Sequence, residues 1–383
     1  MSFLPFALPE IGEEEIHEVV ECLRSGWITT GPRAKQFEED FANYLGGDVE
    51  ALAVNSATSG LHLALEALGV GSGDEVILPS YTFTSTAEVV RYLGATPVFV
   101  DVEESTYNIS IPAIKSVLTD RTKVIMPVHF AGLPCDMTAI LKLAQEYGSY
   151  VVEDAAHAFP TTCNGKLIGT LDSDVTVFSF YANKTMTTAE GGMLVSKRKD
   201  LINRAKVMRL HGISRDAFDR YRSEKPAWYY EVIEAGYKYN MADICAAIGI
   251  HQLRRIDAFH AKRRQLADVY DKELKGLPLT LPPKVKDGDL HAYHLYPIRL
   301  TEDAPISRDD FIQEMSNRKI GCSVHFIPLH RQPVWRDTYK LKKEDFPVAD
   351  SLFEQEVSIP LYTKMTEEDQ KRVLIAIKDI LRG

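Results

Sequence analysis

The sequence predicts an α/β fold, with a mainly parallel sheet flanked by helices and a smaller α+β domain at the C-terminal end. Short apolar runs alternate with helical segments between residues 50 and 200, which is typical of such a sheet. A long helical stretch follows (241–274), and then a loop rich in Pro, Gly and charge (279–289) leads into further strand and helix patterns. Because 383 residues exceed one simple core, we expect a large domain (1–250) and a small C-terminal domain (251–383).

The strands of the large domain are predicted from apolar runs of about five to seven residues. They are Ala51–Asn55, Glu75–Pro79, Thr96–Val102, Lys123–His129, Tyr150–Asp154, Val175–Phe180 and Gly192–Ser196. Helical spacing between them predicts helices at Ser59–Leu68, Thr84–Leu93 and Met137–Tyr147. In the second domain we expect a strand within 291–300 and helices at Arg308–Arg318 and Thr366–Leu381. Ligands of such folds bind at the carboxyl ends of the strands.

The composition argues against several classes of partner. A formal net charge of −10 disfavours general binding to nucleic acid or to an anionic membrane, although a local site can still hold phosphate. No apolar run approaches the roughly 18 residues that span a bilayer, and the first residues lack the pattern of a signal peptide. The five cysteines are scattered without a Cys-x-x-Cys pair, so we expect a cytoplasmic protein with no disulfide framework.

Hydroxylated and acidic residues follow several of the predicted strands. Thr58 and Ser59 lie where a strand passes into a helix, a place suited to phosphate, although a simple helix cap is the better explanation when they are taken alone. Asp154 ends another strand and His157 follows it, and Ser179 ends a third. Each of these has an ordinary structural explanation when it is taken alone. Their convergence on one edge of one sheet favours a binding site.

Lys184 follows the strand that ends at Phe180 and precedes a Gly-Gly turn. A lone lysine is usually a solvated charge. Here it lies among small and hydroxylated residues, on the same edge of the sheet as the carboxylate and the phosphate-type donors. This position indicates a lysine with a chemical function.

Two other patterns predict no site. The segment Gly69–Gly73 resembles a dinucleotide-binding loop, but it ends a helix and precedes a strand, which is the reverse of the required order. His291, His294, His325 and His330 lack acidic or cysteine partners at ligand spacing. We therefore expect no metal.

The sequence resembles the DegT/DnrJ/StrS sugar aminotransferases, which have the fold-type I scaffold of aspartate aminotransferase. The resemblance extends over nearly the whole chain. The matching blocks are SGWITTGP (Ser25–Pro32), FEEDFANYLG (Phe37–Gly46), GDEVILPSYTFTSTA (Gly73–Ala87), GATPVFVDV (Gly94–Val102), VVEDAAHA (Val151–Ala158), FSFYANKTMTTAEGG (Phe178–Gly192), GYKYNMADICAAIG (Gly236–Gly249), VHFIPLH (Val324–His330) and SIPLY (Ser358–Tyr362).

This resemblance implies pyridoxal 5'-phosphate as the cofactor and assigns it a set of residues. Lys184 matches the lysine that holds the cofactor as a Schiff base, and Asp154 matches the carboxylate that pairs with the ring nitrogen. An opposite charge favours the protonated ring, which then accepts electrons from the substrate carbon, while the freed lysine moves protons as general base and acid. The other cofactor residues that the resemblance implies are Thr58, Ser59, Ser179, Phe83, His157 and Asn240.

The resemblance further implies an amino donor, L-glutamate in most of the family, and a nucleotide-linked keto-sugar as acceptor. The substrate residues that it implies are Trp27, Thr29, Lys238 and His325. The segment around Lys238 and Asn240 matches one that the partner subunit inserts into the site, so we expect a homodimer with shared active sites.

Lys238-Tyr239-Asn240 replaces the Asn-Tyr-Arg of many members. It resembles the branch of UDP-4-amino-4-deoxy-L-arabinose aminotransferases, whereas VHFIPLH resembles enzymes that aminate 4-keto-6-deoxyhexoses. We expect amination at C4, for a surface polysaccharide such as lipopolysaccharide. A 3-keto-sugar aminotransferase, a sugar dehydratase and a regulatory homologue without turnover remain as alternatives. Lys184 argues against the dehydratase, in which histidine replaces the lysine.

Overall fold

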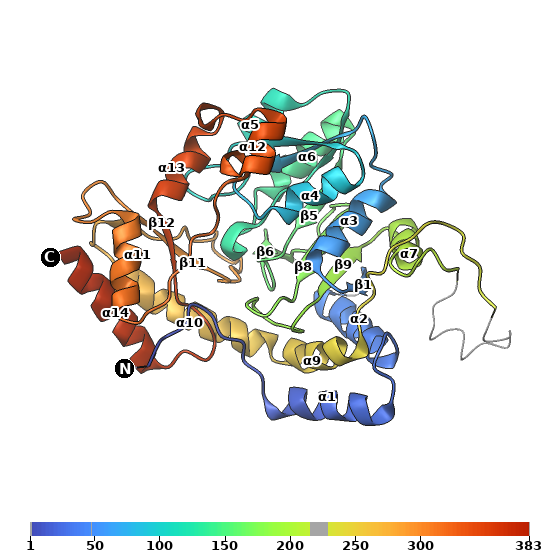
Figure 1. Ribbon diagram of the computed structural model, residues 1–383, viewed down its shortest axis with the longest axis horizontal. Helices are drawn as coiled ribbons and strands as arrows, with labels where there is room; N and C mark the ends of the chain where they lie inside the picture. Colours follow the sequence, from blue (N-terminus) through green and yellow to red (C-terminus); the bar gives the residue numbers. More distant parts are fainter. Residues whose placement is uncertain (1, 47, 215–228, 383) are drawn as a thin grey trace.

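A seven-stranded sheet organises the first half of the chain in the computed structural model, which describes residues 2–46, 48–214 and 229–382. The strand order is β1-β9-β8-β5-β4-β2-β3, and the first four of these strands can be followed in Figure 1. Only β9 runs antiparallel to its neighbours, which confirms the mainly parallel sheet. The strands are β1 (Glu50–Val54), β2 (Glu75–Pro79), β3 (Thr96–Val100), β4 (Thr122–Ile125), β5 (Tyr150–Asp154), β8 (Val175–Ser179) and β9 (Gly192–Ser196).

Both faces of this sheet are buried, which explains why its strands are continuously apolar. In β2, Val76 and Leu78 pack into one core and Ile77 packs into the other, as the alternation of side chains along a strand requires. The first core includes residues of α3 (Ala57–Ala67), α4 (Ser85–Tyr92), α7 (Lys199–Met208), α12 (Pro333–Tyr339) and α13 (Pro347–Gln355). The second includes residues of α2 (Pro32–Leu45), α5 (Ile111–Val117), α6 (Met137–Tyr147) and α9 (Asp243–Arg254).

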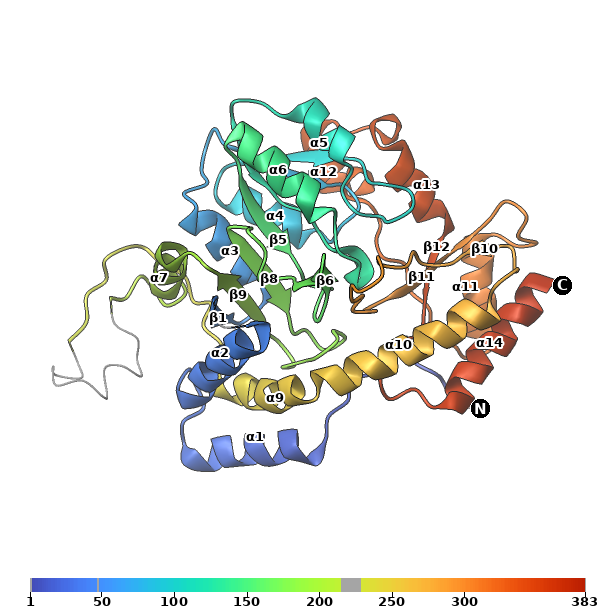
Figure 2. The same ribbon diagram turned by 180° about the vertical axis from the view of Figure 1, so that it is seen from behind.

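The C-terminal part has its own small sheet and core. The antiparallel strands β10 (Leu279–Thr280), β11 (Tyr296–Leu300) and β12 (Glu356–Ile359) pack with α10 (Ile256–Glu273), α11 (Arg308–Asn317) and α14 (Glu367–Arg382). Leu4, near the N-terminus, also belongs to this core and pairs with Ile320. The helix α10 extends from the large sheet to this second unit (Figure 2). A division after residue 250 stays our proposal.

The structure confirms the seven predicted strands, although β3 ends at Val100 rather than Val102 and β4 ends at Ile125 rather than His129. It also changes two details of the second half. The helical stretch from 241 to 274 is two helices, α9 and α10, separated at Arg255. The expected strand within 291–300 begins only at Tyr296. The preceding residues follow a loop instead, because the N–H groups of Ala292 and His294 donate to the carbonyls of Gly132 and Ala131. This loop therefore lies against the large domain.

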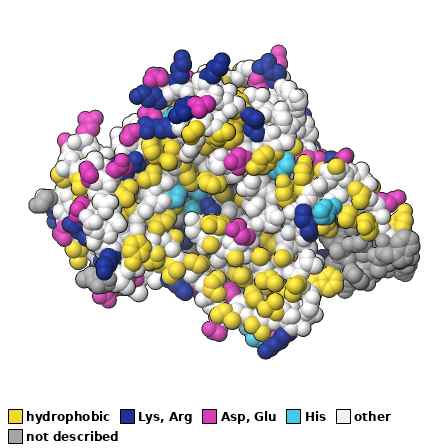
Figure 3. All heavy atoms as spheres, in the orientation of Figure 1, with side chains coloured by type: hydrophobic (Ala, Val, Ile, Leu, Met, Phe, Trp, Pro, Cys, Tyr) yellow, Lys and Arg dark blue, Asp and Glu magenta, His cyan; other side chains and the backbone are white. Residues whose placement is uncertain are grey.

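The remaining elements are α1 (Glu13–Ser25), the hairpin of β6 (Thr162–Cys163) and β7 (Lys166–Leu167), and the 3₁₀ turns η1 (Phe130–Gly132), η2 (Leu329–Arg331) and η3 (Lys343–Asp345). Hydrophobic side chains are spread over the face shown in Figure 3, with acidic and basic side chains among them. Among the described residues, no helix combines the length and the apolar character that crossing a membrane requires.

Candidate active site

A cavity of about 370 Å³ lies at the carboxyl ends of the parallel strands. Its walls come from the segments that follow β1, β2, β4, β5 and β8, from the residues just before β9, and from two loops of the C-terminal part. The predicted site residues that line it are Thr58, Phe83, Asp154, His157, Ser179, Lys184 and His325. Since the chain brings these distant residues to one cavity, their convergence on one edge of the sheet is an observed feature.

Lys184 enters the cavity from a short loop between β8 and β9. Its backbone N–H donates to the carbonyl of Tyr181. The hydroxyls of Thr185 and Thr187 donate to the carbonyls of Phe159 and Phe180, so hydroxyl groups hold the loop just after Lys184. Burial of the amino group lowers the pKa of Lys184 to about 8, although the charge of Asp154 opposes this shift. The uncharged amine that a nucleophile requires is therefore far more populated near neutral pH than for an ordinary lysine, at about a tenth of the molecules at pH 7.

Asp154 is the last residue of β5 and is 5% exposed. Its Oδ2 atom accepts a hydrogen bond of 2.9 Å from the Thr86 hydroxyl, and its Oδ1 atom accepts one of 3.2 Å from the N–H of Ala156. Burial raises the pKa of Asp154, whereas these two hydrogen bonds and the positive charge of Lys184 oppose the rise. The carboxylate is thus oriented, and it is suited to pair with a cationic group in the cavity.

The N-terminus of α3 forms another wall. Ser56 caps this helix by accepting the N–H of Ser59 at 3.1 Å, and Ser56, Ala57 and Thr58 line the cavity. The backbone N–H groups of a first helical turn favour an anion. Gly192 makes the approach possible, because a Cβ there would lie 2.8 Å from backbone atoms of Ser56 and Ala57.

Two histidines face each other beside Lys184. The ring centroids of His157 and His294 are 4.4 Å apart, and the Nε2 atom of His294 lies 3.5 Å from the Lys184 amino group. The Nδ1 atom of His157 accepts the N–H of Ala131 at 3.2 Å, so a neutral ring carries its proton on Nε2. Burial lowers the pKa of both histidines well below the ordinary value, and the charge of Lys184 adds to the effect. Neutral His157 is therefore a hydrogen-bond donor at Nε2.

The aromatic and C-terminal side of the cavity contains Phe83, Phe326 and His325. The ring centroids of Phe83 and Phe326 are 5.9 Å apart, and the Phe83 side chain is 57% exposed. Phe83 is thus available to pack on a planar ring. The ring centroid of His325 lies 5.2 Å from that of Phe326, and His325 is held by hydrogen bonds to β12.

The other predicted residues lie outside the lining of this cavity. The Ser59 hydroxyl donates within the helix cap, to Asn55 at 2.7 Å. Trp27, Thr29, Lys238 and Asn240 gather elsewhere, around Thr30. Asn240 donates to the Thr30 hydroxyl at 2.5 Å, and Trp27 donates to the Thr30 carbonyl at 3.0 Å. The two family segments that carry these residues therefore form one cluster.

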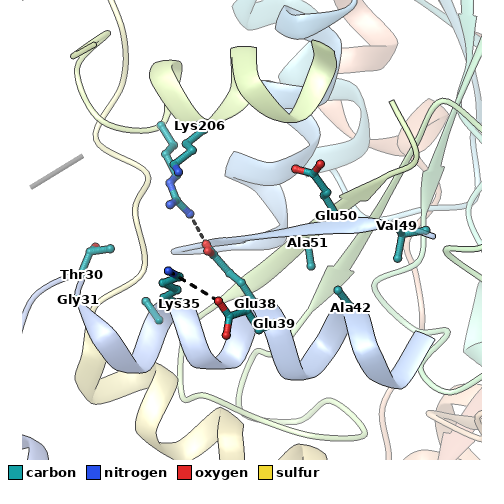
Figure 4. A pocket seen from close by; sticks show the side chains of 12 residues that line it. Thr30, Gly31, Lys35, Glu38, Glu39, Ala42, Val49, Glu50, Ala51 and Lys206 are labelled. Atoms are coloured by element: carbon teal, nitrogen blue, oxygen red, sulfur yellow. Dashed lines mark hydrogen bonds and ion pairs between the residues drawn. The ribbon is translucent and has the colours of Figure 1, made fainter. Parts of the chain in front are cut away.

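A second hollow, of about 250 Å³, adjoins this cluster between α2, β1 and α7 (Figure 4). Glu38 projects from α2 in this view. It forms an ion pair with Arg209. Glu38 accepts the N–H of Ala53, and Arg209 donates to the carbonyl of the same residue. The ion pair thus satisfies the backbone groups of Ala53 at the free edge of β1.

Several cavity residues were not identified from the sequence. Thr86, which orients Asp154, and the lining residues Asn183 and Glu190 lie inside matching family blocks, so those blocks were the available signal. His294 was considered only as a metal ligand. It reaches the cavity through a loop from the second domain, and its spacing in the sequence gives no sign of this. Among the described residues, no three or more His, Cys, Asp or Glu side chains are arranged so that they could hold a metal ion.

The groups in and around the cavity fit pyridoxal phosphate. It combines an amine with a lowered pKa, a buried carboxylate for a ring nitrogen, a helix N-terminus for a phosphate and an exposed phenyl ring. The Nε2 donor of His157 suits a ring oxygen. When bound, this cofactor supplies an electron sink for the substrate carbon.

Comparisons with known proteins agree with this chemistry. The uncharacterized protein MJ1066 of Methanocaldococcus jannaschii is 50% identical over 381 residues, 99% of this chain and 98% of its own. The spore coat polysaccharide biosynthesis protein SpsC of Bacillus subtilis is 45% identical, over 100% of this chain and 98% of its own. The PMP-form of the putative sugar aminotransferase Spr1654 from Streptococcus pneumoniae matches with a TM-score of 0.92 at 33% identity, over 99% of both chains.

Spr1654 also has a PLP-form, which matches with a TM-score of 0.91. The DegT/DnrJ/EryC1/StrS aminotransferase family model matches residues 9–378. The scaffold is that of a fold-type I pyridoxal-phosphate transferase, and the protein is a pyridoxal-phosphate-dependent sugar aminotransferase. The chain belongs to the DegT/DnrJ/EryC1/StrS aminotransferase family.

Proposed function

We propose that this protein transfers the amino group of L-glutamate to C4 of a nucleotide-linked keto-sugar, in the biosynthesis of a surface polysaccharide or lipopolysaccharide. The observation that carries the reaction class is the shared cavity of Lys184 and Asp154 at the carboxyl ends of β5 and β8. The similarity to SpsC, which is named for spore coat polysaccharide biosynthesis, supports the pathway class. The Lys238-Tyr239-Asn240 segment and the VHFIPLH block support C4.

Each cavity residue has a proposed role. Lys184 holds the cofactor and moves a proton at the substrate carbon, for which its pKa of about 8 suits it. Asp154 keeps the ring nitrogen protonated, since its negative charge is oriented by two hydrogen bonds. Thr58 and Ser179 contact the phosphate together with the N-terminus of α3, with Ser59 shaping that turn. Phe83 and His157 contact the ring.

We further propose a cytoplasmic homodimer in which each subunit completes its partner's site. Trp27, Thr29, Lys238 and Asn240 are removed from the lining of their own subunit's cavity, yet they form one cluster. A symmetric dimer can bring such a cluster to the neighbouring cavity. All five cysteines are free thiols, which supports a reducing compartment.

The experiment begins with the purified protein and added pyridoxal phosphate. We expect a visible absorption band from lysine-bound cofactor, and we expect Lys184→Ala to lack it. Lys35→Ala is a matched control, because Lys35 is an exposed lysine outside the cavity lining. A band that persists in the Lys184 variant would assign the cofactor to another lysine.

The substrate is then identified by a half-reaction. The aminated cofactor form is mixed with UDP-, GDP- and dTDP-linked keto-sugars, with the ketone at C3 or at C4. We expect return of the visible band with a 4-keto-sugar. Conversion by 3-keto-sugars alone would contradict the C4 assignment and support the alternative position.

A further inference from the structure

The most informative group outside the assigned roles is a buried carboxyl behind His325. Glu356 is the first residue of β12 and is 0% exposed. Its carboxyl group has no ion pair with any described residue, since Arg308 reaches only its backbone carbonyl, at 3.3 Å. A buried carboxyl group without a counter-ion is costly, so a use for it is to be expected.

The antiparallel pairing of two segments places Glu356 under His325. Ser323 pairs with Ser358 through two backbone hydrogen bonds of 2.8 and 3.1 Å. This register brings His325 opposite Glu356, and the period of two along β12 puts Glu356 and Ser358 on the same face. The N–H of His325 then donates to the Oε2 atom of Glu356 at 2.9 Å.

A continuous hydrogen-bond chain connects this carboxyl group to the cavity. The Oε1 atom of Glu356 lies 2.5 Å from the Ser358 hydroxyl oxygen, which lies 2.9 Å from the Nδ1 atom of His325. His325 lines the cavity. Because its Nδ1 atom is occupied by Ser358, Nε2 is the ring nitrogen that remains for a ligand in the cavity.

We propose that Glu356, Ser358 and His325 form a proton relay that decides whether His325 donates or accepts a hydrogen bond in the substrate cavity. This inference rests on the proposed function for its biological meaning. It names Ser358 and Glu356 as positioning residues that act through His325.

The two states of the relay differ by one proton. With Glu356 ionised, Ser358 donates to Oε1 and His325 donates to Ser358 from Nδ1, so Nε2 presents a lone pair. When Nε2 takes up a proton, the Nδ1 proton passes to Ser358 and the Ser358 proton passes to Oε1. The ring ends neutral with its proton on Nε2, and the carboxylate ends as a neutral acid. A cationic imidazolium beside Lys184 is avoided.

The pKa values of Glu356 and His325, the two ends of the relay, agree with this proton transfer. Burial raises the pKa of Glu356 to about 8, whereas burial and the charge of Lys184 lower the pKa of His325 to about 4. The ring therefore stays neutral near neutral pH, and the carboxyl group is the member that titrates. The groups that influence the relay electrostatically are Arg308, Tyr81, Tyr107, Cys322, Lys184, His157 and His294.

The test uses nitrogen NMR of the full chain with ¹⁵N-labelled histidine and without cofactor. His325→Gln identifies the signals of His325. In the wild type we expect the Nε2–H tautomer at lower pH and the Nδ1–H tautomer at higher pH, with a midpoint near the Glu356 pKa of about 8. In Glu356→Gln the amide donates to Ser358, so we expect the Nε2–H tautomer throughout, from about pH 6.5 to about pH 9.5.

Three further variants make the result decisive even if Glu356→Gln does not fold. Ser358→Ala removes the hydroxyl that connects Glu356 to His325 and should abolish the change of His325 tautomer with pH. Ser358→Thr keeps the hydroxyl and should retain that change. Glu153→Gln alters another buried carboxyl group, bonded to His129 at 2.9 Å, and should leave the His325 titration unchanged. A wild-type His325 with a single tautomer over this pH range, or a step that survives Ser358→Ala, would overturn the relay.

A measurement of cofactor binding distinguishes a failure of the relay from a failure of the proposed function. Glu356→Gln retains Lys184, so we expect its visible band to form as in the wild type. Absence of that band from the wild type contradicts the proposed function, whereas a normal band without a His325 step contradicts the relay alone.

Discussion

Replacement of Thr86 by valine should weaken the enzyme by removing a hydrogen bond from Asp154, and it also removes the contact of 2.9 Å between the Thr86 and Thr82 hydroxyls. The Thr86 hydroxyl is fully buried and donates to the Asp154 carboxylate at 2.9 Å, and valine keeps the shape of the side chain without this donor. A hydrogen bond to a charged group contributes about 1.5–3 kcal/mol, and each 1.4 kcal/mol is a factor of ten in rate. If the carboxylate must be ionised to act, we expect a roughly 10- to 100-fold slower half-reaction with the amino donor.

The pKa of Asp154 predicts the direction in which the pH profile of Thr86→Val should move. Loss of a donor to the ionised form raises the pKa of Asp154 further, beyond the rise that burial already causes. The acidic limb of the half-reaction, followed by cofactor absorbance in single turnovers, should therefore move to higher pH. Thr86→Ser should restore the wild-type limb.

A matched control is available on the neighbouring strand. Thr176 is also buried and donates to a carboxylate, that of Glu153 at 2.7 Å, on the face away from the cavity. Thr176→Val should lower the free energy of unfolding without moving the limb. An unchanged rate and pH profile in Thr86→Val would refute the proposed role of its hydrogen bond.

Three other perturbations test the architecture around the cavity. Gly192→Ala should destabilise the protein by about 1–3 kcal/mol in urea denaturation, because the added Cβ would lie 2.8 Å from backbone atoms at the start of α3. Gly71→Ala should leave the stability unchanged, because a Cβ at Gly71 would meet no atom within 4 Å. Phe41→Ala should cost about 3–5 kcal/mol in the same assay, since Phe41 is fully buried in the second core. In the protein without cofactor, capture of Lys184 by a small aldehyde, trapped by borohydride and measured by mass spectrometry, should be half-maximal near pH 8 rather than near the ordinary lysine value of 10.5.

The sheet was predictable because its strands are buried on both faces. A run such as Val76–Leu78 is apolar at every position and is bounded by turn residues, so a short window suffices to identify it. The loop before β11 was not predictable in the same way. Its residues are as suitable for a strand as those of β11, and the hydrogen bonds to Ala131 and Gly132 that hold it come from a segment about 160 residues away in the sequence.

The contrast between local sequence pattern and packing of distant segments also explains which residues of the site could be predicted. Asp154 and Ser179 end strands of one mainly parallel sheet and Lys184 follows one, and the fold class alone places such positions at one edge. His294 and His325 come from the C-terminal part, whose docking against the sheet depends on packing between distant segments. Gly132 is part of that packing, since it has a φ of 99° and a Cβ there would meet Ala292 at 2.8 Å.

The acidic pair that ends β5 shows how strand geometry separates two chemically similar groups. Glu153 and Asp154 are adjacent, so their side chains point to opposite faces of the sheet. Glu153 bonds to His129 and Thr176 inside the protein and stabilises the packing there. Asp154 turns to the cavity, where its second oxygen is held by Thr86. A shift of one residue in this strand would exchange the two carboxyl groups, so the register of β5 is itself a requirement for the proposed function.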